Sequence, residues 1–343
     1  MTSRSWDRRA PWLHRAGGAR IFDGSSGLLC ANVGQSSRRV KARIEEQFAR
    51  YSFGGAAVVR PHVQMELMDR LCSAVGRPDD SVALVTCGTL GVEVAVGLAR
   101  SITRVRDGKR RGDILTSTLS YHGMSALTLA LAGNHARSPR PEDALGLGPG
   151  FPAPYPPTHA HQGHACDSSC AFEIAQEIDR RGAENVAALL IEPVNGTTGG
   201  AYVPPDGYLR RVSEICRERD VLVIHDEVLT GLWRTGTPLA SRHWEGCEPD
   251  MVILSKGLGA GYTGVGAVTD IRGLGHLYGV EVAPGQLWPV MRAAEDRGVF
   301  FYPFTGAGEP RSEGLVVAPP LISTDEDIEF LIAALSDALD SVS

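Results

Sequence analysis

The chain has 343 residues, 43% of them hydrophobic and 22% charged, and this composition excludes an intrinsically disordered protein. Its 34 basic and 40 acidic side chains give a formal net charge of −6, which argues against a general nucleic-acid-binding protein. The length predicts about two domains. Only Lys41, Lys109 and Lys256 are lysines, so chemistry that requires a lysine amine has three possible positions.

The N-terminal residues contain no apolar core typical of a signal peptide, and no apolar stretch approaches the ~20 residues of a membrane-spanning helix. The seven cysteines are odd in number and scattered, as expected for free thiols in a reducing compartment. We therefore expect a cytoplasmic protein with neither a membrane nor a nucleic-acid partner.

Short apolar runs typical of buried strands alternate with longer amphipathic runs typical of helices. In chain order, the pattern predicts a helix over 38–48, a strand over 82–86, a helix from Gly88, strands over 113–117 and 187–191, a helix over 206–220 capped by Asp206, and strands over 221–224 and 250–254. Strands separated by helices pair in parallel through crossover connections. The sequence therefore predicts an α/β fold whose central sheet is mostly parallel and is covered by helices on both faces.

The composition changes over 138–170, where proline, glycine and histidine dominate and a long loop is expected. After residue 273 the pattern predicts a smaller α+β unit, with strands over 275–282 and 314–320 and helices over 284–297 and 325–339. We thus predict a large domain over 51–270 and a shortened second domain over 271–343. Residues 1–50 are expected to contribute to the small domain and to a dimer interface.

Four groups of residues stand at predicted carboxyl ends of strands, where open α/β sheets bind ligands. They are Gly88 with Thr89, Tyr121 with His122 and Gly123, Asp226, and Lys256. Pyridoxal phosphate needs such a set: a lysine for its aldehyde, a carboxylate for its pyridine nitrogen, a helix start for its phosphate and an aromatic ring against its pyridine face. The ordered set favours a pyridoxal-phosphate site.

Each of these residues also has an ordinary structural interpretation. Asp226 could cap a helix, Lys256 could be a surface turn residue, and the Tyr121 motif could be a turn that carries an aromatic side chain. Only the occurrence of all four groups at strand ends, in this order, favours the functional interpretation.

Several segments resemble the class III aminotransferases, which are pyridoxal-phosphate enzymes of fold type I. The matching segments are TCGTLGVEVAVGLAR, SYHG, LLIEPVNGTTGG, VPPDGYLRRVSEICRERDVLVIHDEVLTGLWRTG and EPDMVILSKGLGAGY. The resemblance implies that Lys256 is the Schiff-base lysine and Asp226 the partner of the pyridinium nitrogen. It further implies Tyr121, with His122 beside it, and Val228 on the two ring faces, Gly88 and Thr89 at the phosphate, and Glu192 beside the substrate.

The same resemblance implies a homodimer that moves an amino group between an amine or amino acid and a keto acceptor by a ping-pong mechanism. Lys256 and Asp226 would be the catalytic residues, and no metal is expected. Decarboxylation, racemisation or an aminomutase step on the same scaffold are alternatives within enzymes. A degenerate, non-catalytic paralogue is the alternative outside them.

Six positions in four segments depart from the family pattern. The residues after Gly-Thr are Leu90, Gly91 and Val92 instead of Glu-Ala-Asn, and Leu229 replaces a frequent Gln. Met124 and Val316 stand where members that clamp a carboxylate often have arginine. We therefore expect an amine or a larger polar metabolite as the amino donor, unless Arg60 or Arg234 replaces the missing clamps.

The largest departure is a gap after Asp270. Family members continue there through several tens of residues that help build the dimeric active site, whereas this chain passes directly to IRGLGHLYGVEV. The gap is the main support for the non-catalytic alternative.

Two further clusters have ordinary interpretations. The segment HAHQGHACDSSC carries His159, His161, His164, Cys166 and Cys170, which could bind zinc, but the spacing matches no standard site and an irregular loop is the simpler prediction. The basic run over 104–111 is expected to be a solvated helix end.

Overall fold

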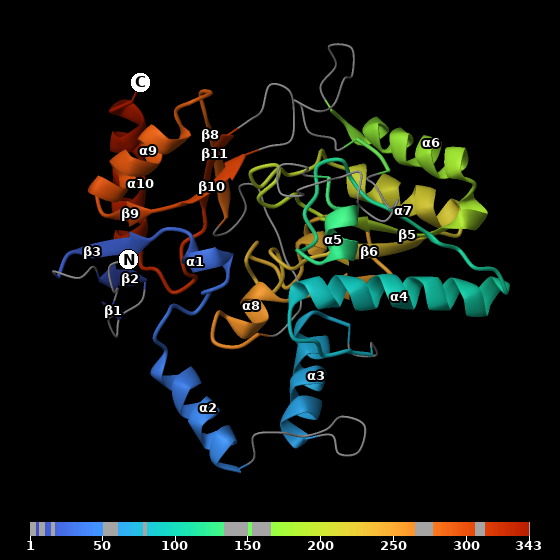
Figure 1. Ribbon diagram of the computed structural model, residues 1–343, viewed down its shortest axis with the longest axis horizontal. Helices are drawn as coiled ribbons and strands as arrows, with labels where there is room; N and C mark the ends of the chain where they lie inside the picture. The colour runs from blue at the N-terminus through green and yellow to red at the C-terminus, as the bar shows by residue number, and fades with distance from the viewer. Residues whose placement is uncertain are drawn as a thin grey trace.

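The computed structural model describes residues 11–14, 18–50, 61–77, 81–133, 150–152, 166–264, 277–305 and 313–342, and the backbone of 5–6. Two lobes are visible (Figure 1). The large lobe comprises the described residues of 61–264. The small lobe combines the N-terminal strands with residues 277–342.

A four-stranded parallel sheet forms the centre of the large lobe and confirms the predicted α/β fold. Its order is β4 (Asp113–Leu115), β5 (Val186–Ile191), β6 (Leu222–Asp226) and β7 (Met251–Ile253). Because all four strands run in the same direction, their carboxyl ends meet at one edge, and Asp226 lies opposite Ile253 in the register.

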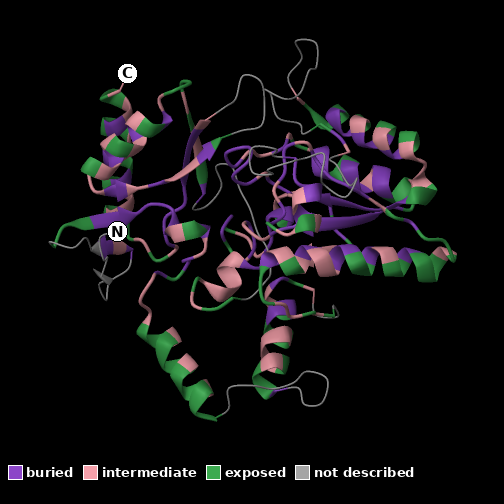
Figure 2. Ribbon diagram, in the orientation of Figure 1, coloured by how far each residue is buried: buried purple, intermediate pink, exposed green. Residues whose placement is uncertain are grey.

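Helices cover both faces of this sheet. Alternate residues of a strand point to opposite sides, and on the central strands both sets are apolar and need to be buried. On β5, Ala188 and Leu190 pack in the core under α4, whereas Leu189 and Ile191 pack in the core under α6 and α7. The strands are therefore buried on both faces (Figure 2). The covering helices are α3 (His62–Ala74), α4 (Gly88–Asp107), α5 (Ala126–Leu131), α6 (Phe172–Arg181) and α7 (Tyr208–Glu218).

The small lobe joins the two ends of the chain. β3 (Arg20–Asp23) pairs in parallel with β9 (Val299–Phe300), and Phe22 packs in one core with residues of both C-terminal helices. Its other elements are β1 (Ser5–Trp6), β2 (Trp12–His14), β8 (Tyr278–Val282), β10 (Tyr302–Thr305), β11 (Glu313–Val317), α9 (Leu287–Asp296) and α10 (Asp325–Asp340). The predicted domain boundaries at 50 and 270 fall at or within undescribed segments and stay predictions.

Six further helical elements lie in the described residues. They are α1 (Ser26–Leu29), α2 (Arg38–Arg50), α8 (Lys256–Gly259) and the 3₁₀ helices η2 (Ser168–Ala171), η3 (Ala183–Asn185) and η4 (Ala240–His243). No helix among the described residues is both long and apolar enough to span a membrane.

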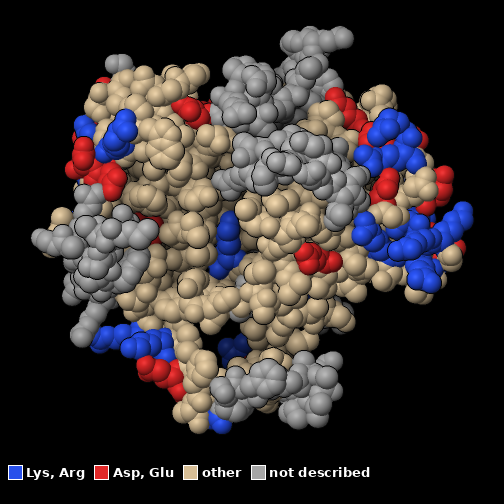
Figure 3. All heavy atoms as spheres, viewed as in Figure 1, with Lys and Arg blue, Asp and Glu red and all other residues tan. Residues whose placement is uncertain are grey.

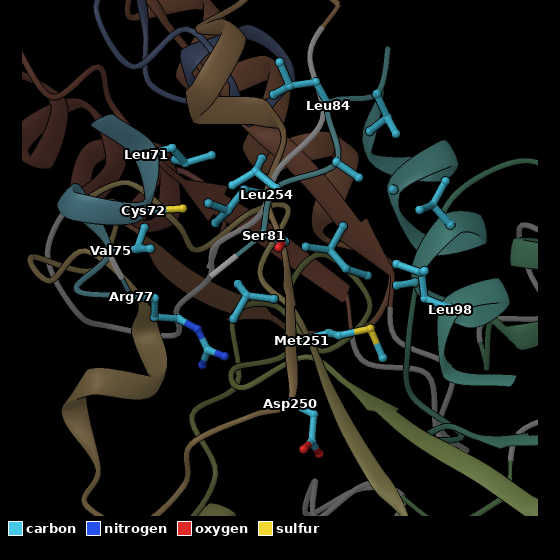
Figure 4. A pocket seen from close by; sticks show the side chains of 18 residues that line it. Leu71, Cys72, Val75, Arg77, Ser81, Leu84, Leu98, Asp250, Met251 and Leu254 are labelled. Atoms are coloured by element: carbon cyan, nitrogen blue, oxygen red, sulfur yellow. The ribbon is translucent and has the colours of Figure 1, made fainter. Parts of the chain in front are cut away.

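Two local predictions were wrong. Residues 82–86 are not a buried strand but an irregular, partly exposed segment, and α7 follows Gly207 in a left-handed conformation without a side-chain cap from Asp206. A cavity of about 280 Å³ separates the first segment from the outer edge of β7 (Figure 4). Without an adjacent strand in hydrogen-bonding distance, the apolar sequence does not form a ladder.

Charged side chains gather over the ends of α4 and α6 that lie far from α8 (Figure 3). The basic run over 104–111 belongs to this surface, and most of it is exposed, as predicted. Arg111 is the exception: it is buried, and it contacts Asp107 at 2.5 Å and Asp220 at 2.9 Å. The run therefore also fastens the end of α4 to the turn before β6.

Candidate active site

A cavity of about 210 Å³ lies at the carboxyl edge of the central sheet. All four predicted groups line it, so the structure brings together residues that are up to 168 positions apart between Gly88 and Lys256. The residues that line it are Gly88, Thr89, Tyr121, His122, Gly123, Glu192, Val194, Gly196, Thr197, Asp226, Val228, Leu229, Thr230, Ser255 and Lys256.

Lys256 is the single lysine on this cavity wall, and all three lysines of the chain lie in the described ranges. It follows the buried end of β7 and begins α8. Lys41 is exposed on α2, where its Nζ lies 3.7 Å from Glu45, and Lys109 is exposed beyond α4. The three candidate positions thus reduce to Lys256.

Asp226 is the last residue of β6 and is held from two directions. Its Oδ2 lies 2.7 Å from His122 Nδ1, and its Oδ1 accepts a hydrogen bond from the Val228 N–H at 3.0 Å. An ionised carboxylate only accepts hydrogen bonds, so Nδ1 of His122 carries the proton in this contact. The other ring nitrogen, Nε2, lies 3.0 Å from the Thr116 hydroxyl, which is its donor when the ring is neutral.

Glu192 follows β5 and is fixed by two backbone donors. Its Oε1 accepts from the Tyr121 N–H at 3.0 Å, and its Oε2 accepts from the Gly196 N–H at 2.8 Å. Burial raises the pKa of this carboxyl to about 7, although the positive potential of His122 opposes the shift. The same residue therefore orients the Tyr121 backbone and forms part of the cavity wall.

The first turn of α4 faces the cavity with its backbone N–H groups. The helix has 20 residues, its N-cap Cys87 makes no side-chain cap hydrogen bond, and its first turn contains no acidic residue. Its dipole and its backbone donors therefore favour an anion next to Gly88 and Thr89. A Cβ at Gly88 would lie 2.7 Å from Val228 Cγ2, so glycine allows the loop after β6 to approach the helix.

Comparison with known proteins identifies the family. A profile of the class-III aminotransferases matches residues 7–270. The chain belongs to the class-III aminotransferase family. It is 32% identical over 264 residues to the uncharacterized aminotransferase YodT of Bacillus subtilis, covering 76% of this chain and 58% of YodT. It is 26% identical over 309 residues to an omega-aminotransferase of Caulobacter vibrioides, covering 87% and 66%.

Solved structures share the fold of this aminotransferase-family chain. A thermostable omega transaminase engineered for the synthesis of enantiopure bulky amines superposes with a TM-score of 0.84 at 20% identity and covers 97% of this chain and 92% of its own. The omega transaminase of Pseudomonas jessenii in complex with PMP gives 0.84 at 20% identity, covering 96% and 90%. At this identity the likeness establishes the fold, and the chain spans 58% to 66% of the lengths of the first two curated relatives.

Class III aminotransferases use pyridoxal 5'-phosphate, and the donor set of the cavity fits that group. It contains an amine at Lys256, a carboxylate at the strand end at Asp226, an aromatic ring at Tyr121 and the uncapped N-terminus of α4. Gly123 has a φ of +134°, and a Cβ there would collide with the Thr89 side chain. A side chain at position 123 would therefore displace the Thr89 side chain, which lines the cavity at the α4 N-terminus.

Three of the substituted family positions, Gly91, Val92 and Val316, pack against apolar neighbours. A Cβ at Gly91 would lie 2.7 Å from Ile253 Cγ2, and Val92 is fully buried in the core under α4. Val316 is buried in a core that also contains Val194 and Phe304, and Met124 is 61% exposed. Neither of the last two positions offers a cation to a carboxylate.

The suggestion that Arg234 replaces a carboxylate clamp is wrong. Arg234 is fully buried and does not line the cavity. It donates from Nη1 to the Pro319 carbonyl at 3.0 Å, and from Nη2 to Asn32 Oδ1 and to Ser26 Oγ. Its guanidinium thus joins the loop after β6 to both ends of the chain. Arg60 lies outside the described residues.

The sequence did not single out several residues of the cavity wall. Gly196 and Thr197 follow Glu192 in the chain, and Thr230 and Ser255 flank Val228 and Lys256. Their positions in the chain, close to residues at strand ends, were the sequence feature that could have placed them in the cavity wall. For the zinc alternative, His159, His161 and His164 lie outside the described residues, and the described part of the chain contains no group of three or more possible metal ligands.

Proposed function

We propose that this chain is a pyridoxal-phosphate-dependent aminotransferase that transfers an amino group from an amine donor to a keto acceptor. The observation that carries the proposal is the single cavity that unites Lys256, Asp226, Tyr121 and the N-terminus of α4 at the carboxyl edge of the sheet. Membership of the class-III family supports the same reaction.

When bound, pyridoxal 5'-phosphate supplies an aldehyde that condenses with amines and a ring that accepts electron density. Lys256 Nζ is the group that would hold the aldehyde. Once released by a donor amine, Nζ would be the base that takes the proton from the donor carbon in the first half of the reaction. In the second half it would deliver a proton to the acceptor carbon. Lys256 begins a short helix at a buried strand end, which limits where its amine can reach.

Asp226 would hold the proton of the ring nitrogen through its carboxylate. The contact with His122 and the Val228 N–H fixes the orientation of that carboxylate before any ligand binds. Gly88 and Thr89 would bind the phosphate, with Tyr121 and Val228 against the two ring faces. The Glu192 carboxylate accepts from the Tyr121 N–H and would lie beside the substrate.

We also propose a homodimer. Leu90 and Met124 are 37% and 61% exposed, and each follows a cavity-lining residue in the chain. Trp233, on the loop after β6, is 46% exposed. A second copy packed over these side chains would bury apolar surface next to the cavity and close it from water. Light scattering on the purified protein tests this state.

Trapping of the cofactor tests the proposed function directly. The protein is purified with added cofactor, reduced with borohydride and mapped by peptide mass spectrometry. We expect visible absorbance before reduction and a label on Lys256 alone. The Lys256→Ala variant should keep its circular dichroism spectrum and lose both the label and transamination of every amine offered.

Product analysis separates this function from its alternatives. A carbonyl product from the donor and an amine from the acceptor, in equal amounts, support transamination. Carbon dioxide release or an isomerised donor would instead support decarboxylation or racemisation. A protein that takes up no cofactor at any lysine would be the non-catalytic paralogue.

A further inference from the structure

The proposed mechanism assigns no role in cofactor binding to one titratable side chain of the cavity wall. Among the cavity-lining residues, the titratable groups other than tyrosine are Lys256, Asp226, His122 and Glu192. Asp226 and His122 contact each other at 2.7 Å, and Lys256 is assigned to the cofactor. Glu192 is therefore the remaining acidic side chain of the described wall that can meet the part of a substrate that does not react.

The geometry of Glu192 leaves room for another donor. A carboxylate has about four lone-pair positions, and the hydrogen bonds from Tyr121 and Gly196 use one on each oxygen. Within the described residues no lysine, arginine or histidine forms an ion pair with it, and it keeps partial exposure where it lines the cavity. Each oxygen can thus accept one further hydrogen bond from a ligand.

The rest of the wall disfavours an anion at this place. The described lining contains no guanidinium, and the nearest candidate in the sequence, Arg234, is enclosed by Asn32, Ser26 and Pro319. A substrate carboxylate next to Glu192 would meet an acidic group, and the described lining offers no guanidinium to compensate it. An ammonium there would instead form a charge-assisted hydrogen bond.

We propose that Glu192 binds a second ammonium group of the amino donor, so that the preferred donors are diamines. This inference rests on the proposed function and specifies its substrate class. One amine of the diamine reacts at Lys256, and the distal amine donates to the remaining lone pairs of Glu192. The contact needs no movement of the wall, because the two backbone donors already fix the carboxylate.

Donors that differ only at the distal end test the proposal. We would measure kcat/KM with pyruvate as acceptor for 1,5-diaminopentane, pentylamine and 5-aminopentanoate, and repeat the series with four- and six-carbon chains. We expect the diamine to exceed the monoamine by roughly tenfold or more at the best length, and the amino acid to be the poorest donor. In Glu192→Gln the diamine preference should fall to within about threefold.

Matched variants and a spectroscopic readout keep the outcomes distinct. Glu329→Gln removes the same charge from the exposed face of α10 and should leave the donor order intact. A wild-type protein that forms the lysine-linked absorbance but uses pentylamine as well as the diamines overturns the role of Glu192 alone. Equal losses for all three donors in Glu192→Gln also overturn it, because that residue would then act only on the Tyr121 backbone. Absence of the absorbance in the wild type overturns the proposed function together with this inference.

Discussion

Asp226 and His225 are consecutive residues on β6 with opposite environments. Asp226 has two hydrogen-bond partners at the cavity, whereas His225 is 1% exposed and its Nδ1 has no hydrogen-bond partner among the described residues. Burial, and to a smaller extent the charge of Arg77, lowers the pKa of His225 to about 3. The neutral imidazole is therefore part of the folded state, and its protonation opposes folding.

This shift predicts an acid-sensitive contribution to stability. The unfolded chain binds the proton at a pKa near 6.5, so stability is lost progressively as the pH falls from about 6.5 towards 3. At pH 5 the loss from this one group is about 2 kcal/mol by that linkage. Leucine at position 225 does not titrate. The difference in the free energy of unfolding, His225→Leu minus wild type, should therefore be more positive at pH 5 than at pH 8 by about that amount.

Urea unfolding of both proteins at the two pH values gives the difference directly. The value at pH 8 serves as the internal reference for any change in packing. If the difference in the free energy of unfolding between the two proteins were the same at pH 8 and at pH 5, His225 would not titrate in this pH range.

Some environments of single residues could be predicted from the sequence, and others could not. Lys256 and Asp226 were predictable because each directly follows a recognisable apolar strand, and a parallel sheet brings such residues together. The environment of Arg234 was not, because its partners come from positions 26, 32 and 319, which no local pattern relates to it. Contacts between distant segments depend on the packed fold.

Helix α4 illustrates how one element contains glycines with opposite roles. Gly91 faces β7, where a Cβ would lie 2.7 Å from Ile253 Cγ2. Gly97 is exposed, and a Cβ there would meet nothing within 4 Å. The sequence predicted the helix but not this difference, because the packing of β7 against the first turns decides it.

The two glycines give a paired prediction. Gly97→Ala should stabilise the protein by about 0.5–1 kcal/mol, since alanine restricts the unfolded chain and favours helix at no steric cost. Gly91→Ala should destabilise it by roughly 1–3 kcal/mol, because the added methyl group displaces Ile253 or the helix. Differential scanning calorimetry of both variants measures the two signs. Equal effects would contradict the packing of α4 on β7.

At the scale of the element, the segment over 82–86 shows a failure of prediction from the hydrophobic pattern, since it was expected to be a strand and is irregular. Its apolar residues predicted a strand, yet they face the cavity of about 280 Å³ beside β7 (Figure 4). Strand formation requires a partner backbone at about 4.8 Å. The sequence alone cannot tell whether that partner is present.

At the scale of the whole molecule, polar contacts of residues 26–34 and 319–321 with the large lobe and with each other join the two lobes. The Asn32 carbonyl accepts from the Leu321 N–H at 2.9 Å, and the Tyr262 hydroxyl donates to the Gly34 carbonyl at 3.0 Å. Arg234 donates to Asn32 and to Pro319 at the centre of this joint. The N-terminal segment, the C-terminal segment and the loop after β6 are thus fastened at one place.

Removal of the Arg234 guanidinium should destabilise the contacts among the N-terminal segment, the C-terminal segment and the loop after β6. Arg234→Met keeps an unbranched side chain but leaves the acceptors on Asn32 and Pro319 without their donor, so the free energy of unfolding should fall by roughly 2 kcal/mol or more. Arg292→Met, an exposed position on α9, is the matched control and should change stability by less than ~0.5 kcal/mol.

Hydrogen exchange locates the effect. Because the joint connects the lobes, amides of the segments over 18–37 and 313–321 should lose protection in Arg234→Met, whereas amides of β5, buried in the large lobe, should keep it. A uniform loss across β5 and both segments would mean that the lobes unfold as one cooperative unit. Unchanged exchange in all three would mean that Arg234 contributes nothing to holding the segments together. Only a loss of protection in the two segments, with β5 unchanged, supports the idea that the Arg234 contacts hold the small lobe against the large lobe.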